Sequence, residues 1–281
     1  MSNPPYVLFE LCHFMHLYEW YPKRCTYYTL HDNKKQELLL ISLEVILTRQ
    51  FIYNGQSSRD LGIILSGEDT WNTPVPDFEH ISVPGRSGDL LLSNRRFSNV
   101  DVTYRCGIPR FFAQTYTALM DFLLSDPGYH RLEDSYHSEV YRIGIMESEV
   151  SSCMGALNHS GTFDLTFSCK PQQYLKSGER TTVFSANGSI FNPTRFDARP
   201  LLRIVGTGQI GIGEETVTIS SNSNYIDLDC EAENAICGAA NMNGAITLSS
   251  GEFPKLRPGS NGIVLGSGIT RLEITPRWWR I

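Results

Sequence analysis

Most of the chain after residue 46 alternates apolar and polar residues, which is the pattern of half-buried β-strands. The first alternating run ends in Asn54-Gly55, a pair typical of tight hairpin turns. Pro74-Val75-Pro76 cannot lie in a central strand, because proline has no N–H to donate. The strands predicted in the first half are residues 49–55, 61–65, 100–106, 142–150 and 161–169, the last two as an antiparallel pair.

One segment has the 3.6-residue period of a helix instead. Apolar side chains recur from Phe111 and Phe112 through Leu119 to Phe122 and Leu123. The spacing predicts an amphipathic helix over residues 110–125 that covers one face of a β-sandwich. The first domain is therefore expected to be an α+β unit, a β-sandwich plus one helix.

The second half of the chain is predicted to be a separate β-sandwich or jelly roll. Short apolar runs with turn signals every 8 to 12 residues are typical of such folds. The runs are residues 200–206, 216–220, 225–229, 245–248, 262–265 and 269–276. We expect a mainly β protein with two β-sandwich domains, residues 47–180 and 192–281, joined by a linker at residues 181–191 that is rich in Ser, Gly, Asn and Thr.

The first 46 residues follow neither period. His13 and His16 lie near Cys12 and Cys25, but this spacing matches no zinc pattern. We interpret this segment as a docking arm or as an upstream extension of the reading frame.

Composition and net charge argue against several classes of partner. The 281 residues carry a net charge of −6, which argues against a nucleic-acid or anionic-membrane partner. The sequence contains no run of 18 apolar residues, so no membrane-spanning helix is predicted. The seven cysteines include no C-x-x-C pair and are odd in number, so we expect reduced, mostly buried thiols.

Three sequence motifs superficially resemble cofactor-binding or catalytic sites. Residues 206–211 spell G-x-G-x-x-G, but strand-like residues follow where a dinucleotide loop needs a helix, so a Gly-rich hairpin is expected. Residues 85–89 approach a nucleophilic-serine loop, but Asp89 replaces its last glycine, and a tight turn with Arg86 facing a neighbour is expected. Glu147 and Glu149 share one face of a predicted strand and are interpreted as solvated charges. We therefore predict no catalytic residue, no cofactor and no metal.

With these residues laid out, the chain from residue 47 to the end resembles the distal tail (Dit) family of long-tailed, non-contractile phages, also known as siphovirus-type tail components. The matching pieces occur in the family's order. They are residues 51–63, 83–90, Asn192 with Pro200, residues 206–208, 225–229, 251–261 and 277–279.

The resemblance implies a structural protein of a phage or prophage tail tip, made in the bacterial host cytoplasm. Family members form a hexameric ring that joins the tail tube to the baseplate or adsorption apparatus, with a ring-forming first domain and a galectin-like second domain. The implied partners are further copies of the chain, the major tail protein, the tail-associated hub or lysin protein and the tape-measure protein, with a receptor-binding protein or host glycan as another possible partner.

Two groups of residues are candidates for contacts. The subunit interface is predicted at Gly85, Arg86, Ser87, Gly88 and Asp89, where glycines shape the loop. Trp278 and Trp279 either contact a glycan or partner or close the last strand onto the core, and we favour the core. The alternatives to the ring protein are a carbohydrate-binding module on the tail tip and, less favoured, a glycan-cleaving enzyme.

Overall fold

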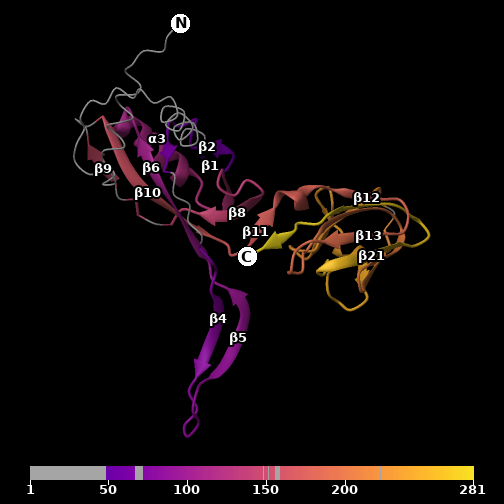
Figure 1. Cartoon of the computed structure of the whole chain (residues 1–281). Coiled ribbons are helices and arrows are strands. Elements are labelled where there is room, and N and C mark those ends of the chain that lie inside the picture. Colours follow the sequence, from indigo (N-terminus) through magenta and orange to yellow (C-terminus); the bar gives the residue numbers. More distant parts are fainter. Residues whose placement is uncertain (1–48, 67–71, 148, 151, 156–158, 222) are drawn as a thin grey trace, which may run out of the picture. The chain divides into compact units, whose positions relative to one another are not determined.

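The computed structural model describes residues 49–66, 72–147, 149–150, 152–155, 159–221 and 223–281. The predictions for the first 46 residues lie outside this part of the chain. The protein is mainly β, with one α-helix among the described residues. It divides into two compact units, which Figure 1 shows in sequence colours. Unit 1 holds the described residues up to Ser138 together with Ile143–Pro171, and unit 2 holds Glu139–Arg142 and Gln172–Ile281.

Unit 1 is built on one large antiparallel sheet. Its path runs β2-β1-β7-β8-β10-β6-β3, and β9 pairs with β10. The longest pairing joins β6 and β10, from Val100 opposite Cys169 to Ile108 opposite Gly161. The strands are β1 (Phe51–Tyr53), β2 (Gln56–Ser57), β3 (Ile64–Leu65), β6 (Val100–Ile108), β7 (His130–Asp134), β8 (Val140–Ile145), β9 (Ser152–Gly155) and β10 (Ser160–Cys169). Only the second half of β8, from Ile143, is counted in unit 1.

Alternation along these strands places every second side chain in the core, as the sequence predicts. In β10, Phe163, Leu165 and Phe167 are buried. The Phe167 ring packs against Phe51 and Tyr104, with centroids 5.8 and 6.1 Å away. These aromatic contacts join β1, β6 and β10 into one core.

The predicted helix is confirmed as α3 (Phe112–Ser125), whose buried residues are Phe112, Leu119 and Leu123. All three pack into the core of the unit 1 sheet. Phe111 does not belong to the buried stripe, because it is the N-cap residue, has a positive φ of 55° and is 63% exposed.

Strand β8 is shorter than predicted. It ends at Ile145, so Glu147 and Glu149 lie beyond it rather than on one strand face. Its pairing with β10 is antiparallel as expected, but it covers only Ser168 opposite Ile145 and Cys169 opposite Gly144.

Unit 1 also contains a hairpin that the sequence does not predict. Strands β4 (Pro76–Ile81) and β5 (Leu90–Phe97) form a sheet of their own. Figure 1 draws them as a separate two-stranded ribbon. Nearly all of their residues are exposed.

Unit 2 is a β-sandwich, as predicted for the second half of the chain. A six-stranded and a five-stranded sheet enclose a core that includes Leu202, Ile210, Val217 and Leu272. The first sheet is ordered β12 (Thr182–Phe184), β22 (Ile269–Thr275), β14 (Leu201–Gly206), β17 (Ile226–Asp229), β18 (Asn234–Cys237) and β19 (Ala240–Asn241). The second is ordered β13 (Gly188–Asn192), β21 (Gly259–Leu265), β15 (Gly208–Ile212), β16 (Glu215–Ile219) and β20 (Ile246–Leu248).

Residues 181–191 hold strands where the sequence predicts a linker. β12 pairs with β22 and β13 pairs with β21, so this segment contributes to both sheets of unit 2. Ile190 points into the core, and the polar residues around it lie on exposed positions of the strands or in the turn between them. The division between the units follows Pro171 instead.

The remaining short elements of unit 2 are two strands and two 3-10 helices. Strand β11 (Gln173–Leu175) pairs with the last strand, β23 (Trp279–Arg280). The 3-10 helices are η1 (Lys176–Glu179), which follows β11, and η2 (Asn243–Ala245).

The G-x-G-x-x-G segment makes a corner between the two sheets of unit 2. β14 lies in one sheet and β15 in the other, so the segment is neither a nucleotide loop nor the hairpin that the sequence predicts. Gly206 and Gly208 have φ angles of 114° and 137°, which only glycine adopts without strain. A Cβ at Gly206 would lie 2.1 Å from the Gly268 carbonyl oxygen. The glycines therefore allow two backbone segments to touch.

We expect Gly206→Ala to lower the free energy of unfolding of unit 2 by about 1–3 kcal/mol or more, because the new methyl group meets a backbone atom that cannot rotate away. Gly262→Ala is the matched control, because its Cβ would meet no atom within 4 Å and its φ is not positive. Urea unfolding of the two variants measures the difference, and equal stabilities would contradict the close approach.

Candidate functional site

The described residues contain none of the catalytic arrangements that the motifs suggest. Ser87 lies in the exposed β4–β5 loop, and no helix follows it. Glu147 and Glu149 are exposed and lie outside any strand. No group of three His, Cys, Asp or Glu side chains in this part of the chain could hold a metal ion. Two other features are candidates for function, namely the β4–β5 hairpin and a pocket in unit 2.

The predicted interface loop forms the tip of the hairpin. Residues 82–89 connect β4 to β5 and are all exposed. The Arg86 N–H donates to the Val83 carbonyl over 3.1 Å, which closes a turn with Pro84 and Gly85 at its centre. Gly85 has a φ of 80°, as a type II turn requires at its third residue. The local sequence therefore builds a firm turn that presents Arg86 to solvent.

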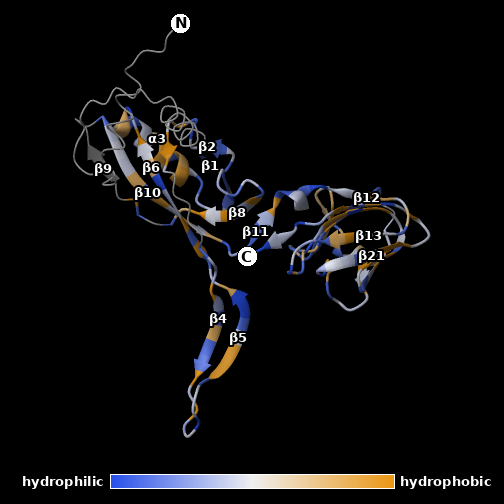
Figure 2. Cartoon of the chain, in the orientation of Figure 1, coloured by the Kyte–Doolittle hydropathy of each residue, from blue (hydrophilic) through white to orange (hydrophobic). Residues whose placement is uncertain are grey.

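The hairpin behind this loop is apolar on both faces. Ile81 pairs with Leu90, and Leu92 on the same face pairs with Glu79. On the other face, Leu91 pairs with His80, and Phe78 pairs with Ser93. Leu90, Leu91 and Leu92 are 49%, 52% and 50% exposed. Figure 2 shows this stretch of β5 in the colour of hydrophobic residues.

An isolated two-stranded hairpin is at best marginally stable in water, and large exposed apolar patches mark interaction sites. The apolar residues of the hairpin lie on two faces, and among the described strands β4 and β5 pair only with each other. The geometry therefore favours a partner that covers the hairpin.

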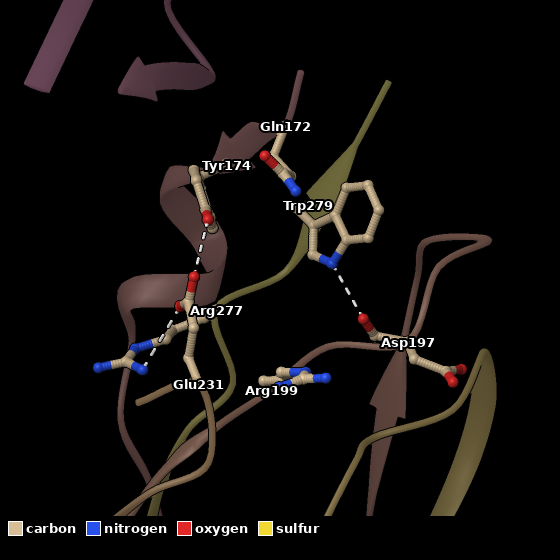
Figure 3. Close-up of a pocket in the computed structure, with 7 residues that line it drawn as sticks. All are labelled: Gln172, Tyr174, Asp197, Arg199, Glu231, Arg277 and Trp279. Atoms are coloured by element: carbon tan, nitrogen blue, oxygen red, sulfur yellow. Dashed lines mark hydrogen bonds and ion pairs between the residues drawn. The ribbon is translucent and has the colours of Figure 1, made fainter. Parts of the chain in front are cut away.

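The second candidate is a pocket of about 330 Å³ whose lining residues all belong to unit 2. Its aromatic wall comes from the pairing of β11 with β23, which sets Tyr174 opposite Trp279. Paired residues of an antiparallel ladder share one face, so both side chains can line the pocket. Figure 3 shows the Tyr174 ring near Glu231, away from the Trp279 indole. The lining residues, shown in Figure 3, are Gln172, Tyr174, Asp197, Arg199, Glu231, Arg277 and Trp279.

Ring stacking and hydrogen bonds hold both aromatic side chains in place. The Trp279 indole stacks on Phe196 at a centroid distance of 4.4 Å, and its Nε1–H donates to the Asp197 carbonyl over 2.9 Å. The Tyr174 ring stacks on Tyr141 at 5.3 Å. The Tyr174 hydroxyl donates to Glu231 over 3.2 Å. Burial, followed by the Glu231 carboxylate, raises the pKa of Tyr174, so this hydroxyl stays protonated and donates.

Three ion pairs hold the charged wall, and in one of them Arg277 lies 3.6 Å from Glu231. Arg277 donates from two guanidinium nitrogens to the two carboxylate oxygens of Asp229, over 2.7 and 2.9 Å. Arg199 pairs with Glu233 at 2.9 Å. Figure 3 shows Trp279 on one side, Glu231 and Arg277 on the other, and Arg199 between them.

The Arg277–Asp229 pair predicts a pH dependence of stability. Hydrogen bonds from Arg277 hold the pKa of Asp229 below its ordinary value of 3.8. A carboxyl group with a lowered folded-state pKa stabilises the fold above its unfolded pKa, and this stability is lost as the pH falls through the folded pKa. We expect Asp229→Asn to cost about 1.5–3 kcal/mol near neutral pH, since one partner of a charged pair is lost.

This cost should persist down to about pH 4 and shrink at lower pH. Urea unfolding of the wild type and of Asp229→Asn over this pH range measures it. A difference that is constant down to the most acidic pH would contradict the role of the ion pair.

The structure separates the two tryptophans that the sequence groups together. Trp278 is only 5% exposed and belongs to the core of unit 2, whereas Trp279 lines the pocket. No sequence pattern predicts Tyr174, Glu231 or Arg277 as site residues. The three leucines of β5 are not predicted as a surface either, although their run directly after the glycine loop is a local signal for one.

No helix in the described part of the chain is long and apolar enough to cross a membrane.

Comparisons with known proteins identify the fold. No protein-family model matches the sequence, and no curated protein is similar to it. A solved structure of the SPP1 Dit protein matches with a TM-score of 0.67 and 13% identity, over 83% of this chain and all of that chain. That protein is described as a paradigm of the hub adsorption apparatus in phages that infect Gram-positive bacteria. The phage p2 baseplate in its activated conformation matches with a TM-score of 0.47 and 12% identity, over 83% of this chain and 98% of the other. The fold of this chain is thus that of a phage distal tail protein.

Proposed function

We propose that this chain is a structural component of the tail tip of a long-tailed phage or prophage. Copies of it form a hexameric ring that joins the tail tube to the adsorption apparatus. The observation that carries the proposal is the likeness to SPP1 Dit, which extends over the whole length of that protein. We assign the chain no catalytic role.

The β4–β5 hairpin is the element that suits ring closure. A ring of identical subunits needs a surface on one copy that fits a different surface on the next. The exposed apolar faces around Leu90, Leu91 and Leu92 supply the hydrophobic part of such a contact. The tip residues Gly85, Arg86, Ser87, Gly88 and Asp89 add a charged, firmly turned end.

The ring contacts the major tail protein on one side and the tail-associated hub or lysin protein on the other. The tape-measure protein and a receptor-binding protein are its further partners. These assignments follow from the proposed place at the tail tip.

Labelling of particles tests the location. Gold-labelled antibodies raised against the chain should bind one end of the tail in particles from a strain that carries the gene. Pre-immune antibodies are the control. Label on the capsid would contradict the proposal. So would the absence of label, even after mild disruption of the tail, on particles in which mass spectrometry detects the chain.

A further inference from the structure

The pocket of unit 2 has the chemistry of a small-molecule site. Its volume of about 330 Å³ lies at the lower end of the usual range of about 300–1,000 Å³ for such sites. Asp197, Arg199 and Glu231 are exposed, so a ligand can enter from solvent. These dimensions suit one small ring-shaped group.

Trp279 supplies an apolar platform in this pocket. One side of its indole is covered by Phe196, which is not among the lining residues. The remaining surface of the ring faces the pocket together with Tyr174. Because stacking on Phe196 and a hydrogen bond to the Asp197 carbonyl hold the indole in place, a ligand that stacks on it removes little side-chain entropy.

The polar wall has no positive charge to spare. Two arginines and two carboxylates line it, and both arginines already pair with further acidic residues, Glu233 and Asp229. Acidic groups therefore outnumber the arginines, so the pocket does not attract a phosphate or a carboxylate ligand. Arg199 and the Gln172 amide have donors to offer, and Glu231 and Gln172 have acceptors.

We propose that this pocket binds a neutral saccharide unit. A sugar ring has a face of C–H groups that packs on an aromatic ring, and a rim of hydroxyls that both donate and accept hydrogen bonds. Trp279 is the platform for that face. Gln172, Arg199 and Glu231 bond the hydroxyls. The assignment concerns unit 2 alone and does not depend on ring assembly.

Saturation-transfer NMR on the full chain tests the proposal with D-glucose, D-galactose, D-mannose and N-acetyl-D-glucosamine. D-Glucuronate is the charged comparison. We expect at least one neutral sugar to bind with a Kd on the order of 1 mM, as befits so small a ligand. No signal from any neutral sugar at tens of millimolar, or stronger binding of glucuronate than of every neutral sugar, would overturn the proposal.

Matched variants locate the binding. Arg199→Ala and Gln172→Ala should each weaken binding about tenfold, because each removes hydrogen bonds to hydroxyls. Arg257→Ala is the control, since Arg257 is also an exposed arginine paired with a glutamate, Glu214. Trp279→Ala should abolish binding while circular dichroism stays unchanged, and if this variant unfolds, the other two still decide. Sugar binding that survives both Arg199→Ala and Gln172→Ala unchanged would overturn the assignment.

Discussion

Replacement of Leu90, Leu91 and Leu92 by serine should convert the assembled protein into a folded monomer. In the proposed ring these side chains leave water when a neighbouring copy covers the hairpin. Each buried leucine contributes about 1.5–3 kcal/mol, so three of them weaken the contact by about a thousandfold or more. Sedimentation velocity measures the mass of the assembly, and circular dichroism checks that the chain is folded.

A pair of changes in unit 2 provides the matched control. Phe191→Ser and Val264→Ser also remove exposed apolar side chains, 66% and 54% exposed, from β13 and β21. This double variant should assemble like the wild type. If the leucine variant assembles equally well, the hairpin is not the subunit contact.

Removal of one large core side chain should destabilise one unit and spare the other. Phe167 and Leu202 are both fully buried, the first in the core of unit 1 and the second in the core of unit 2. The two cores share no residue among the described clusters. We expect Phe167→Ala to cost about 3–5 kcal/mol in unit 1 and Leu202→Ala about 2–5 kcal/mol in unit 2.

Differential scanning calorimetry of the two variants should show two transitions, each lowered by only one of the substitutions. Phe191→Ala, which removes an exposed ring, should shift neither transition. A single transition that both core substitutions lower equally would contradict two independently folded units.

The sequence predicts strands such as β6 and β10, and the helix, because their burial follows the local period. Alternating burial along β10 and the stripe of Phe112, Leu119 and Leu123 are local patterns that one-sided burial imposes. The β4–β5 hairpin is not predicted in this way. Leu90, Leu91 and Leu92 make both faces of β5 apolar, so its sequence does not alternate between apolar and polar residues. The strands in residues 181–191 are not predicted either, because the polar residues at their exposed strand and turn positions resemble those of a linker.

The pocket could not be predicted from the sequence for a different reason. Trp279 stands out in the sequence as a large ring near the end of the chain, but its neighbour Tyr174 comes from a strand more than a hundred residues earlier. Only the pairing of β11 with β23 brings them together, and no local pattern encodes that pairing. The turn at the tip of the hairpin is predictable, because Pro84, Gly85 and Gly88 are a local turn signal.

The mass of the purified full-length protein in solution tests the central claim most directly. Multi-angle light scattering at micromolar concentration should give six times the chain mass of 31.7 kDa, about 190 kDa. A mass that stays at 31.7 kDa as the concentration is raised would contradict a chain that closes into a ring through its own hairpin.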